Sequence, residues 1–247
     1  MAPPKNIIAR HVAVGAVCLL VFFVLTLGAV GVWDAEAVDM TLNHAVAAWR
    51  RPVLTNVMFV ITSLGDSAYL IFMGLLIVAT LAARRAWRAA LATAVAFLLL
   101  PFLVSTIKGT MARIRPTADL YSGADAFSFP SGHASNSTLI YGTLALLAFT
   151  SLKGTARWLV SIGLVLLIIL IAFSRIYTGA HWPSDSLAGL ALGAGVLSAL
   201  SCVLIHMHPT PDTARTTTLP LTGFALTAPV YAWYALPFAH TFYKALA

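Results

Sequence analysis

Residues 158–185 read WLVSIGLVLLIILIAFSRIYTGAHWPSD and join an uncharged apolar run to a cluster of polar side chains. The run, 158–174, is long enough as a helix to cross a hydrocarbon layer of ~30 Å. The polar cluster, 174–185, begins where that helix is expected to end. Because polar groups at the edge of a membrane are costly and need a physical reason, this stretch predicts both a transmembrane fold and a site.

Five further uncharged tracts of at least 17 residues occur in the chain of 247 residues, at 12–33, 67–83, 89–107, 134–152 and 186–205. The composition is 60% hydrophobic and only 9% charged, whereas a soluble domain carries about 25% charged residues. This balance excludes an ordinary soluble globule, a disordered chain and a collagen-like chain. We expect an all-α polytopic membrane helix bundle with six core transmembrane helices.

The regions outside these tracts are expected to be less regular. Apolar residues recur at roughly helical spacing in 34–66, which predicts an amphipathic segment on the outer surface, with an ordinary loop as the alternative. The six-span core is expected to cover 1–206. The tail, 207–247, includes an uncharged stretch at 216–243 that contains three prolines, and it is expected to be a seventh, broken span or an interfacial segment. The tract 12–33 is expected to be a span, with a cleaved secretory signal as the alternative.

The basic residues indicate orientation, not a nucleic-acid partner. The net charge is +7, but the positive side chains stand in small groups at the ends of the apolar tracts. With the N-terminus inside, the cytoplasmic loops hold eight of the 15 Lys and Arg residues. We therefore expect a bacterial inner membrane protein whose loops after the third and fifth tracts face the periplasm. No nucleic-acid partner and no obligate protein partner are expected.

Three polar clusters fall on that outer side. They read KGTMARIRP at 108–116, FPSGHASNS at 129–137 and SRIYTGAHWPSD at 174–185. The basic side chains of these clusters are suited to binding an anion. Arg115 and Arg175 can each bind a phosphoryl group with two hydrogen bonds, and Lys108 supplies a point charge.

The second cluster opens the fourth span. Ser131 suits the N-cap of that helix, and Gly132 lets the backbone approach an anion at the positive end of the helix dipole. Together with the cations, these residues predict a phosphate site. Arg113 stands outside the pattern and is expected to contact the surface or a lipid headgroup.

The histidines supply the chemistry. His181 and Asp185 lie four residues apart at a helix start set by Pro183, so the carboxylate can hold one ring nitrogen and leave the other as a nucleophile. His133, from another helix, is free to protonate a leaving oxygen. The two cysteines, Cys18 and Cys202, indicate neither a disulfide framework nor a metal site.

These motifs, K-x6-RP, PSGH and SR-x5-H-x3-D, resemble the three-part signature of the type 2 phosphatidic acid phosphatase superfamily. The resemblance implies a metal-independent phosphatase with His181 as nucleophile, Asp185 as its orienting partner and His133 as general acid. It also implies phosphoryl-oxygen ligands, which are Lys108, Arg115, Ser131, Gly132 and Arg175. Soluble vanadate-dependent haloperoxidases carry the same signature, but six apolar tracts argue against that branch. The superfamily's core does not require the tail 207–247.

A site at the outer membrane surface favours an amphiphilic substrate. We expect hydrolysis of a lipid phosphate or diphosphate, such as undecaprenyl diphosphate, phosphatidylglycerophosphate or lipid A phosphate, with no cofactor and no metal. The alternatives are a phosphotransferase that uses the same phosphohistidine and a non-enzymatic anion channel or transporter. The sequence does not distinguish among the lipids.

Overall fold

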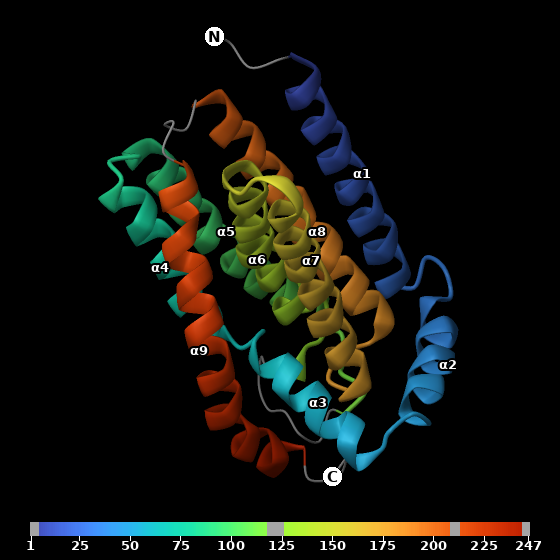
Figure 1. The fold of residues 1–247 in the computed structure, drawn as a ribbon. Helices are drawn as coiled ribbons and strands as arrows, with labels where there is room; N and C mark the ends of the chain where they lie inside the picture. Colours follow the sequence, from blue (N-terminus) through green and yellow to red (C-terminus); the bar gives the residue numbers. More distant parts are fainter. Residues whose placement is uncertain (1–4, 118–125, 208–212, 244–247) are drawn as a thin grey trace.

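The computed structural model describes residues 5–117, 126–207 and 213–243, and these residues form nine α-helices (Figure 1). The helices are α1 (Lys5–Ala29), α2 (Ala35–Ala47), α3 (Pro52–Ser63), α4 (Ser67–Ala83), α5 (Trp87–Met111), α6 (Gly132–Ser151), α7 (Gly154–Tyr177), α8 (Pro183–His206) and α9 (Thr213–Phe242). The expected all-α bundle is confirmed. Each of the six uncharged tracts corresponds to one helix, α1 or one of α4 to α8.

Segment 34–66 folds as the two short helices α2 and α3. Pro52 is the first residue of α3, a position where proline is tolerated because the missing N–H has no partner within the helix there. α2 begins at an N-cap, Asp34, whose side chain accepts from the backbone N–H of Ala37. Each of the two helices therefore starts on a local signal.

Helix α6 is the centre of the bundle, in contact with α4, α5, α7, α8 and α9. Among the described residues, α1, α5, α7 and α8 are long and apolar enough to cross a membrane, and α3 with α4, bent by 43°, is a fifth candidate. The first turns of α6 contain Ser135, Asn136 and Ser137, so its composition is less apolar. A helix enclosed by other helices does not need an apolar surface, and the total of six core spans stays a prediction.

Two glycines bring α8 close to the start of α6. A Cβ atom on Gly189 would lie 2.5 Å from the carbonyl oxygen of Ser131, and one on Gly193 would lie 2.5 Å from that of Ser135. Glycines four residues apart allow such close backbone approach in membrane helices. The backbone N–H of Ser131 also donates to the carbonyl of Asp185 at 3.0 Å. The N-termini of α6 and α8 are thereby fixed side by side.

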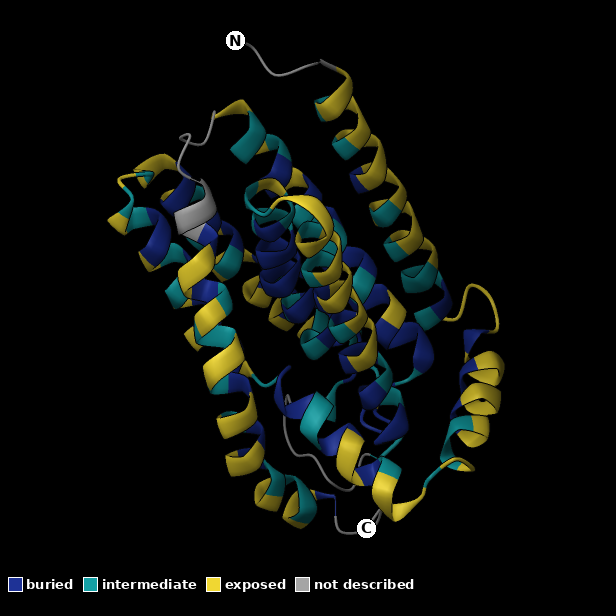
Figure 2. Cartoon of the chain, in the orientation of Figure 1, coloured by how far each residue is buried: buried dark blue, intermediate teal, exposed yellow. Residues whose placement is uncertain are grey.

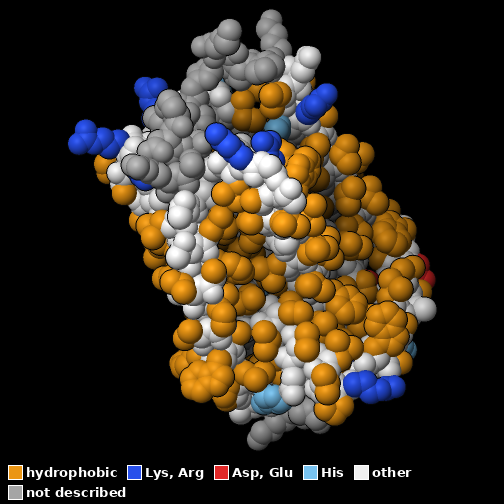
Figure 3. Space-filling view, in the orientation of Figure 1, with side chains coloured by type: hydrophobic (Ala, Val, Ile, Leu, Met, Phe, Trp, Pro, Cys, Tyr) orange, Lys and Arg blue, Asp and Glu red, His pale blue; other side chains and the backbone are white. Residues whose placement is uncertain are grey.

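The outer helices expose their apolar residues. Helix α1 packs along α8 and is largely exposed elsewhere, as are the outward faces of α7 and α9 (Figure 2). In Figure 3, hydrophobic side chains cover the middle of the visible surface, and Lys and Arg side chains lie toward its ends. This distribution is typical of a protein surrounded by lipid.

The tail forms one helix, α9, which contains Pro220, Pro229 and Pro237. It runs from the end of the bundle where α8 finishes to the end where α3 lies (Figure 1). At its start, the Thr217 hydroxyl donates to the carbonyl of Leu147 on α6 at 3.1 Å. Packing against α3, α4 and α6 supports a helix that its prolines weaken.

Candidate active site

The residues of the three motifs gather at one end of the bundle. Helix α5 ends there, α6 begins there, and α7 turns into α8 there, beside α3 and the final turns of α9 (Figure 1). The part of the connection between α5 and α6 at 118–125 lies outside the described residues. The candidate site is therefore built from the ends of helices that come from distant parts of the chain.

The turn from α7 to α8 places His181. Gly179 has φ +68°, a left-handed conformation that favours glycine, and the N–H of His181 donates to the carbonyl of Arg175 at 3.1 Å. His181 is 1% exposed. Arg115 Nη1 lies 3.0 Å from its Nε2 atom. Because a guanidinium can only donate, Nε2 is the unprotonated nitrogen and carries the lone pair.

The surroundings of His181 keep the ring neutral. Burial lowers the pKa of His181 well below 6.5, and the positive charges of Arg115, Lys108 and Arg175 lower this pKa further. A neutral imidazole with its lone pair on Nε2, beside cationic groups that suit an anion, has the protonation state that nucleophilic attack requires. The geometry at His181 therefore fits the role that its motif predicts.

Asp185 lies fully buried at the start of α8, where Pro183 is the first helical residue as expected. Its Oδ2 atom accepts from the N–H of Trp182 at 2.9 Å. The same oxygen lies 3.6 Å from His181 Nδ1, which is longer than a hydrogen bond. Asp185 thus fixes the N-terminus of its own helix and faces the protonated nitrogen of the histidine.

Arg113 does not lie at the surface as the sequence predicted. Its Nη1 atom donates to Asp185 Oδ1 at 2.7 Å, and its Nη2 atom donates to Asp39 Oδ2 at 2.7 Å. Asp39, on α2, is 2% exposed and also accepts from the N–H of Ser184 at 2.8 Å. The expectation was wrong because two buried carboxylates, remote from Arg113 in the sequence, meet at this guanidinium and need a positive partner.

The other cations lie around the same end. Lys108 Nζ donates to the carbonyl of Phe127 at 2.9 Å. The Nη1 atom of Arg115 also donates to the carbonyl of Ala180 at 2.6 Å. Arg175, 5% exposed, donates through Nη1 to Thr62 Oγ1 at 2.8 Å and to the Tyr243 hydroxyl at 3.1 Å. These contacts hold the charged groups of α5, of the segment that follows it and of α7 toward one location.

Ser131 is the N-cap of α6, as expected, and its Oγ atom accepts from the N–H of Ala134 at 3.4 Å. A Cβ atom on Gly132 would touch only Val104 Cγ1, at 3.6 Å. The protein's own packing therefore does not require glycine at this position. The space beside the Gly132 backbone stays open at a helix N-terminus, where an anion is favoured.

His133 lies at the next position of α6 and is more open than His181. Its side chain is 23% exposed, and its Nε2 atom lies 3.1 Å from Asp66 Oδ1. His133 is close enough to His181 to influence its titration. The structure thus brings together all eight residues that the motifs predicted and adds others, which are Asp39, Asp66, Arg113 and Tyr243.

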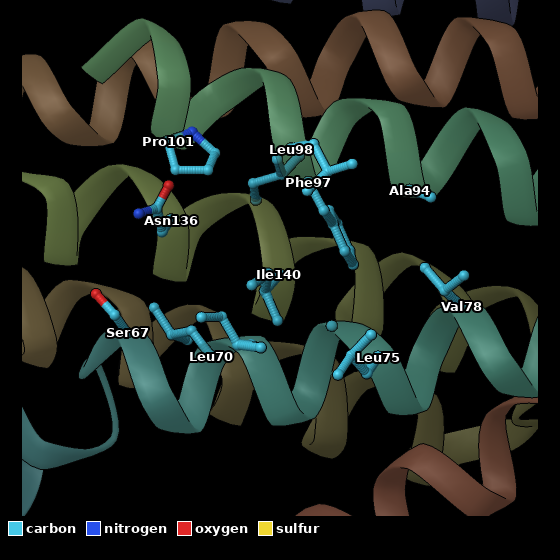
Figure 4. A pocket seen from close by; sticks show the side chains of 13 residues that line it. Ser67, Leu70, Leu75, Val78, Ala94, Phe97, Leu98, Pro101, Asn136 and Ile140 are labelled. Carbon is cyan, nitrogen blue, oxygen red and sulfur yellow. The ribbon is translucent and has the colours of Figure 1, made fainter. Parts of the chain in front are cut away.

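An apolar cavity of about 420 Å³ lies between α4, α5 and α6, and its lining includes Asn136 of α6 and Ser67 of α4. Figure 4 shows Ser67 and Asn136 at one end, with Phe97, Leu75 and Val78 toward the other. Asn136 is one turn beyond His133, and Ile140 lies a turn farther on the same face of α6. The cavity therefore leads from the site along the hydrophobic side of the bundle.

No three His, Cys, Asp or Glu side chains in the described parts of the chain gather closely enough to hold a metal ion. The groups that converge on His181 are cations, whereas Mg²⁺ and Ca²⁺ require oxygen ligands. The donor set thus suits an anion.

Comparison with known proteins identifies the family. Residues 85–209, half of the chain, match the PAP2 superfamily. The chain belongs to the PAP2 superfamily. It is 29% identical to phosphatidylglycerophosphatase B of Bacillus subtilis over 72% of this chain and 88% of that protein. It is 31% identical to lipid A 1-phosphatase of Rhizobium etli over 69% of this chain and 81% of that protein.

A solved structure agrees with this membership. The crystal structure of the transmembrane PAP2 type phosphatidylglycerolphosphate phosphatase from Bacillus subtilis is similar with a TM-score of 0.66 and 27% identity, over 76% of this chain and 94% of that one. The protein is accordingly a multi-pass integral membrane protein of a lipid phosphatase family. The PAP2 match ends before α9 begins.

Sequence reasoning missed Asp39, Asp66 and Tyr243. Each lies outside the three motifs and outside the PAP2 match. One weak signal was present for the two acids, because few carboxylates occur in so apolar a chain and a carboxylate beside a span needs a partner. Nothing in the sequence indicated which partner.

Proposed function

We propose that this protein hydrolyses a lipid phosphate or diphosphate through a phosphohistidine at His181. The observation that carries this proposal is the contact of Arg115 Nη1 with His181 Nε2 at 3.0 Å, because a guanidinium can only donate and Nε2 therefore carries the lone pair that faces the cationic site. The Nε2 atom attacks phosphorus, the bond from phosphorus to the lipid oxygen breaks, and His133 gives that oxygen a proton. Water then cleaves the phosphorus–nitrogen bond and releases inorganic phosphate.

The remaining motif residues hold the phosphoryl group in this mechanism. Arg115 and Arg175 bind its oxygens with paired N–H groups, Lys108 adds charge, and the N–H groups after Ser131 and Gly132 complete the set. Asp185 keeps the proton of His181 on Nδ1, so that Nε2 attacks. Charge that develops on the oxygens in the transition state is stabilised by groups already in place.

The apolar cavity supports a lipid substrate. One end of the cavity is lined by Asn136, one turn beyond His133 on α6, and by Ser67. In this proposal His133 protonates the leaving oxygen, so this end lies toward the leaving group. A lipid that leaves on this side extends its chain along α4, α5 and α6. The relatives act, by name, on phosphatidylglycerophosphate and lipid A, and both have this arrangement of phosphate and hydrocarbon.

A phosphate-release panel tests the function. Purified protein is assayed with phosphatidylglycerophosphate, undecaprenyl diphosphate, phosphatidic acid and lipid A, with His181→Ala as control. We expect turnover of at least one lipid by the wild type, none by the variant, and no loss of activity in EDTA. Labelled phosphate recovered in a lipid would establish a phosphotransferase, and no turnover of any lipid would favour an anion channel.

We also propose that the site faces outward from a bacterial inner membrane. The basic residues Arg85, Arg88 and Arg157 lie at the opposite ends of the helices that lead to the site, in keeping with the positive-inside rule. A cysteine at exposed Val53, near the site, should react with a membrane-impermeant thiol reagent in spheroplasts, and one at exposed Trp87 should not. Cys18 and Cys202 are first replaced by serine. The opposite labelling would place the chemistry in the cytoplasm.

A further inference from the structure

Asp66 stands at the N-cap of α4 but does not cap it. An aspartate at this position normally accepts from a backbone N–H of the first turn, and Asp66 makes no such bond. Its Oδ1 atom instead lies 3.1 Å from His133 Nε2 on α6, 67 residues away in the chain. The carboxylate is therefore directed from its own helix toward the ring of the proposed general acid.

The junction that carries Asp66 is fixed against α6. The Tyr141 hydroxyl donates to the carbonyl of Leu64 at 2.6 Å. A Cβ atom on Gly65 would lie 3.0 Å from His133 Cδ2 and 2.6 Å from Ile171 Cγ2. The backbone before Asp66 thus packs directly on the imidazole, with no room for a side chain between them. The contact between Asp66 and His133 belongs to a rigid junction.

Helix α9 supports the carboxylate from the other side. The Tyr231 hydroxyl donates to Asp66 Oδ2 at 3.4 Å. The Tyr231 ring stacks on Tyr69 with centroids 4.9 Å apart, and the Tyr69 hydroxyl contacts Thr227 of α9 at 3.1 Å. Both oxygens of Asp66 therefore have partners, one on α6 and one on α9.

We propose that Asp66 is the positioning residue for His133, with Tyr231 as its support. This inference rests on the proposed function, in which His133 protonates the leaving oxygen. Asp66 accepts a hydrogen bond from the Nε2–H group of the imidazolium and so turns Nδ1 toward the leaving oxygen. When the bond from phosphorus to oxygen breaks, the Nδ1 proton moves to that oxygen, and the ring, now neutral, keeps its Nε2 proton in the hydrogen bond to Asp66.

The effect of Asp66 should depend on the leaving group. We compare wild type with Asp66→Asn on dioctanoyl phosphatidic acid, whose leaving group is a poor alkoxide, and on p-nitrophenyl phosphate, whose leaving group is stable. Orientation of an imidazole by its partner is worth about 10- to 100-fold in rate, so kcat on phosphatidic acid should fall by that factor. On p-nitrophenyl phosphate, kcat should change by less than about threefold, since acid assistance matters least there.

Matched controls separate positioning from folding. Asp34→Asn changes the exposed N-cap of α2 and should leave both rates at the wild-type level. Asp66→Glu keeps the carboxylate and should recover part of the loss on phosphatidic acid. Tyr231→Phe should lower kcat on phosphatidic acid by about twofold, as expected for one weak hydrogen bond. Tyr234→Phe, a change on the same helix, should have no effect.

A double variant tests whether Asp66 acts through His133. If it does, His133→Ala with Asp66→Asn is no slower on phosphatidic acid than His133→Ala alone. A slower double variant, an equal loss on both substrates, or an unchanged Asp66→Asn beside an impaired His133→Ala would overturn this inference. A wild type without turnover contradicts the proposed function itself, and a fully active His133→Ala contradicts the role of His133. Thermal unfolding of each variant identifies any that fail to fold.

Discussion

The two histidines of the site lie in unlike surroundings. His181 is 1% exposed, and its partners come from the motifs and the turn that carries it. The His133 side chain is 23% exposed and lies one turn before Asn136, which lines the apolar cavity. Its partner, Asp66, comes from the junction of α3 and α4, supported by α9. The groups that contact His181 lie within the PAP2 match, whereas the contact of His133 with Asp66 comes from outside it.

This difference corresponds to a division of the chemistry. The phosphoryl group is the same in every substrate of this kind, so the half around His181 can be closed and made of the motif residues. The leaving group differs from one lipid to another, and the half around His133 must admit it.

The largest effect should distinguish the two histidines themselves. His181→Gln removes the nucleophile and should lower kcat by about 10⁴ or more on both aryl and lipid phosphates. His133→Gln should cost about 10²–10⁴ on a lipid phosphate and much less on p-nitrophenyl phosphate. Steady-state rates on the two substrates measure this. Equal losses in the two variants on both substrates would remove the distinction between the halves of the site.

The next effect concerns the support of Asp185. Arg113→Gln leaves Asp39 and Asp185 as buried carboxylates without this guanidinium, and loss of one partner of a buried pair costs about 3–5 kcal/mol of stability. We expect a lower unfolding temperature and a kcat reduced by about 10-fold or more, with KM little changed. Arg88→Gln, at the exposed far end of α5, is the control. A large rise in KM alone would show that Arg113 binds the substrate directly.

A third test concerns the titration of His181. The pKa of this ring is held well below 6.5 by burial and then by Arg115, so Arg115→Gln should raise the pKa toward 6.5. Histidine NMR of labelled protein measures the shift, with His181→Gln to assign the signal. An unchanged titration midpoint would contradict the electrostatic role of Arg115.

The same shift has a consequence for stability. Below pH 6.5 the unfolded chain binds a proton at His181 that the native protein does not bind, so this group lowers the unfolding free energy as the pH falls. Above pH 6.5 the group makes no such contribution. The unfolding free energy should therefore fall less steeply with decreasing pH in Arg115→Gln than in the wild type.

The smallest effect should come from the contact of α9 with the other half of the site. Tyr243→Phe removes the hydroxyl that accepts from Arg175, which keeps its bond to Thr62. A hydrogen bond to one neutral partner contributes about 1 kcal/mol. We therefore expect KM to rise by less than about tenfold, with kcat nearly constant. Tyr234→Phe provides the comparison. Identical kinetics in the two variants would mean that Tyr243 supports packing alone.

The sequence by itself determined the membrane class, the helices and the PAP2 membership. Long uncharged tracts indicate a membrane environment, because a helix that faces the hydrocarbon layer must be predominantly apolar wherever it packs in the bundle. The roles of several motif residues could also be predicted from the sequence. Ser131 and Pro183 stand at the starts of α6 and α8, and His181 lies four residues before Asp185. These are local relations, and a local relation is visible in the order of the residues.

Only the tertiary structure decided which distant groups meet. Asp66 reaches His133 across 67 residues, Arg113 reaches Asp39 across 74, and Tyr243 reaches Arg175 across 68. Such contacts depend on how helices pack, as where Gly189 and Gly193 let α8 approach α6, and packing is set by the shapes of two surfaces at once. The fold therefore determined which residues support the two histidines. The sequence around Asp66, Asp39 and Tyr243 does not indicate which groups they contact.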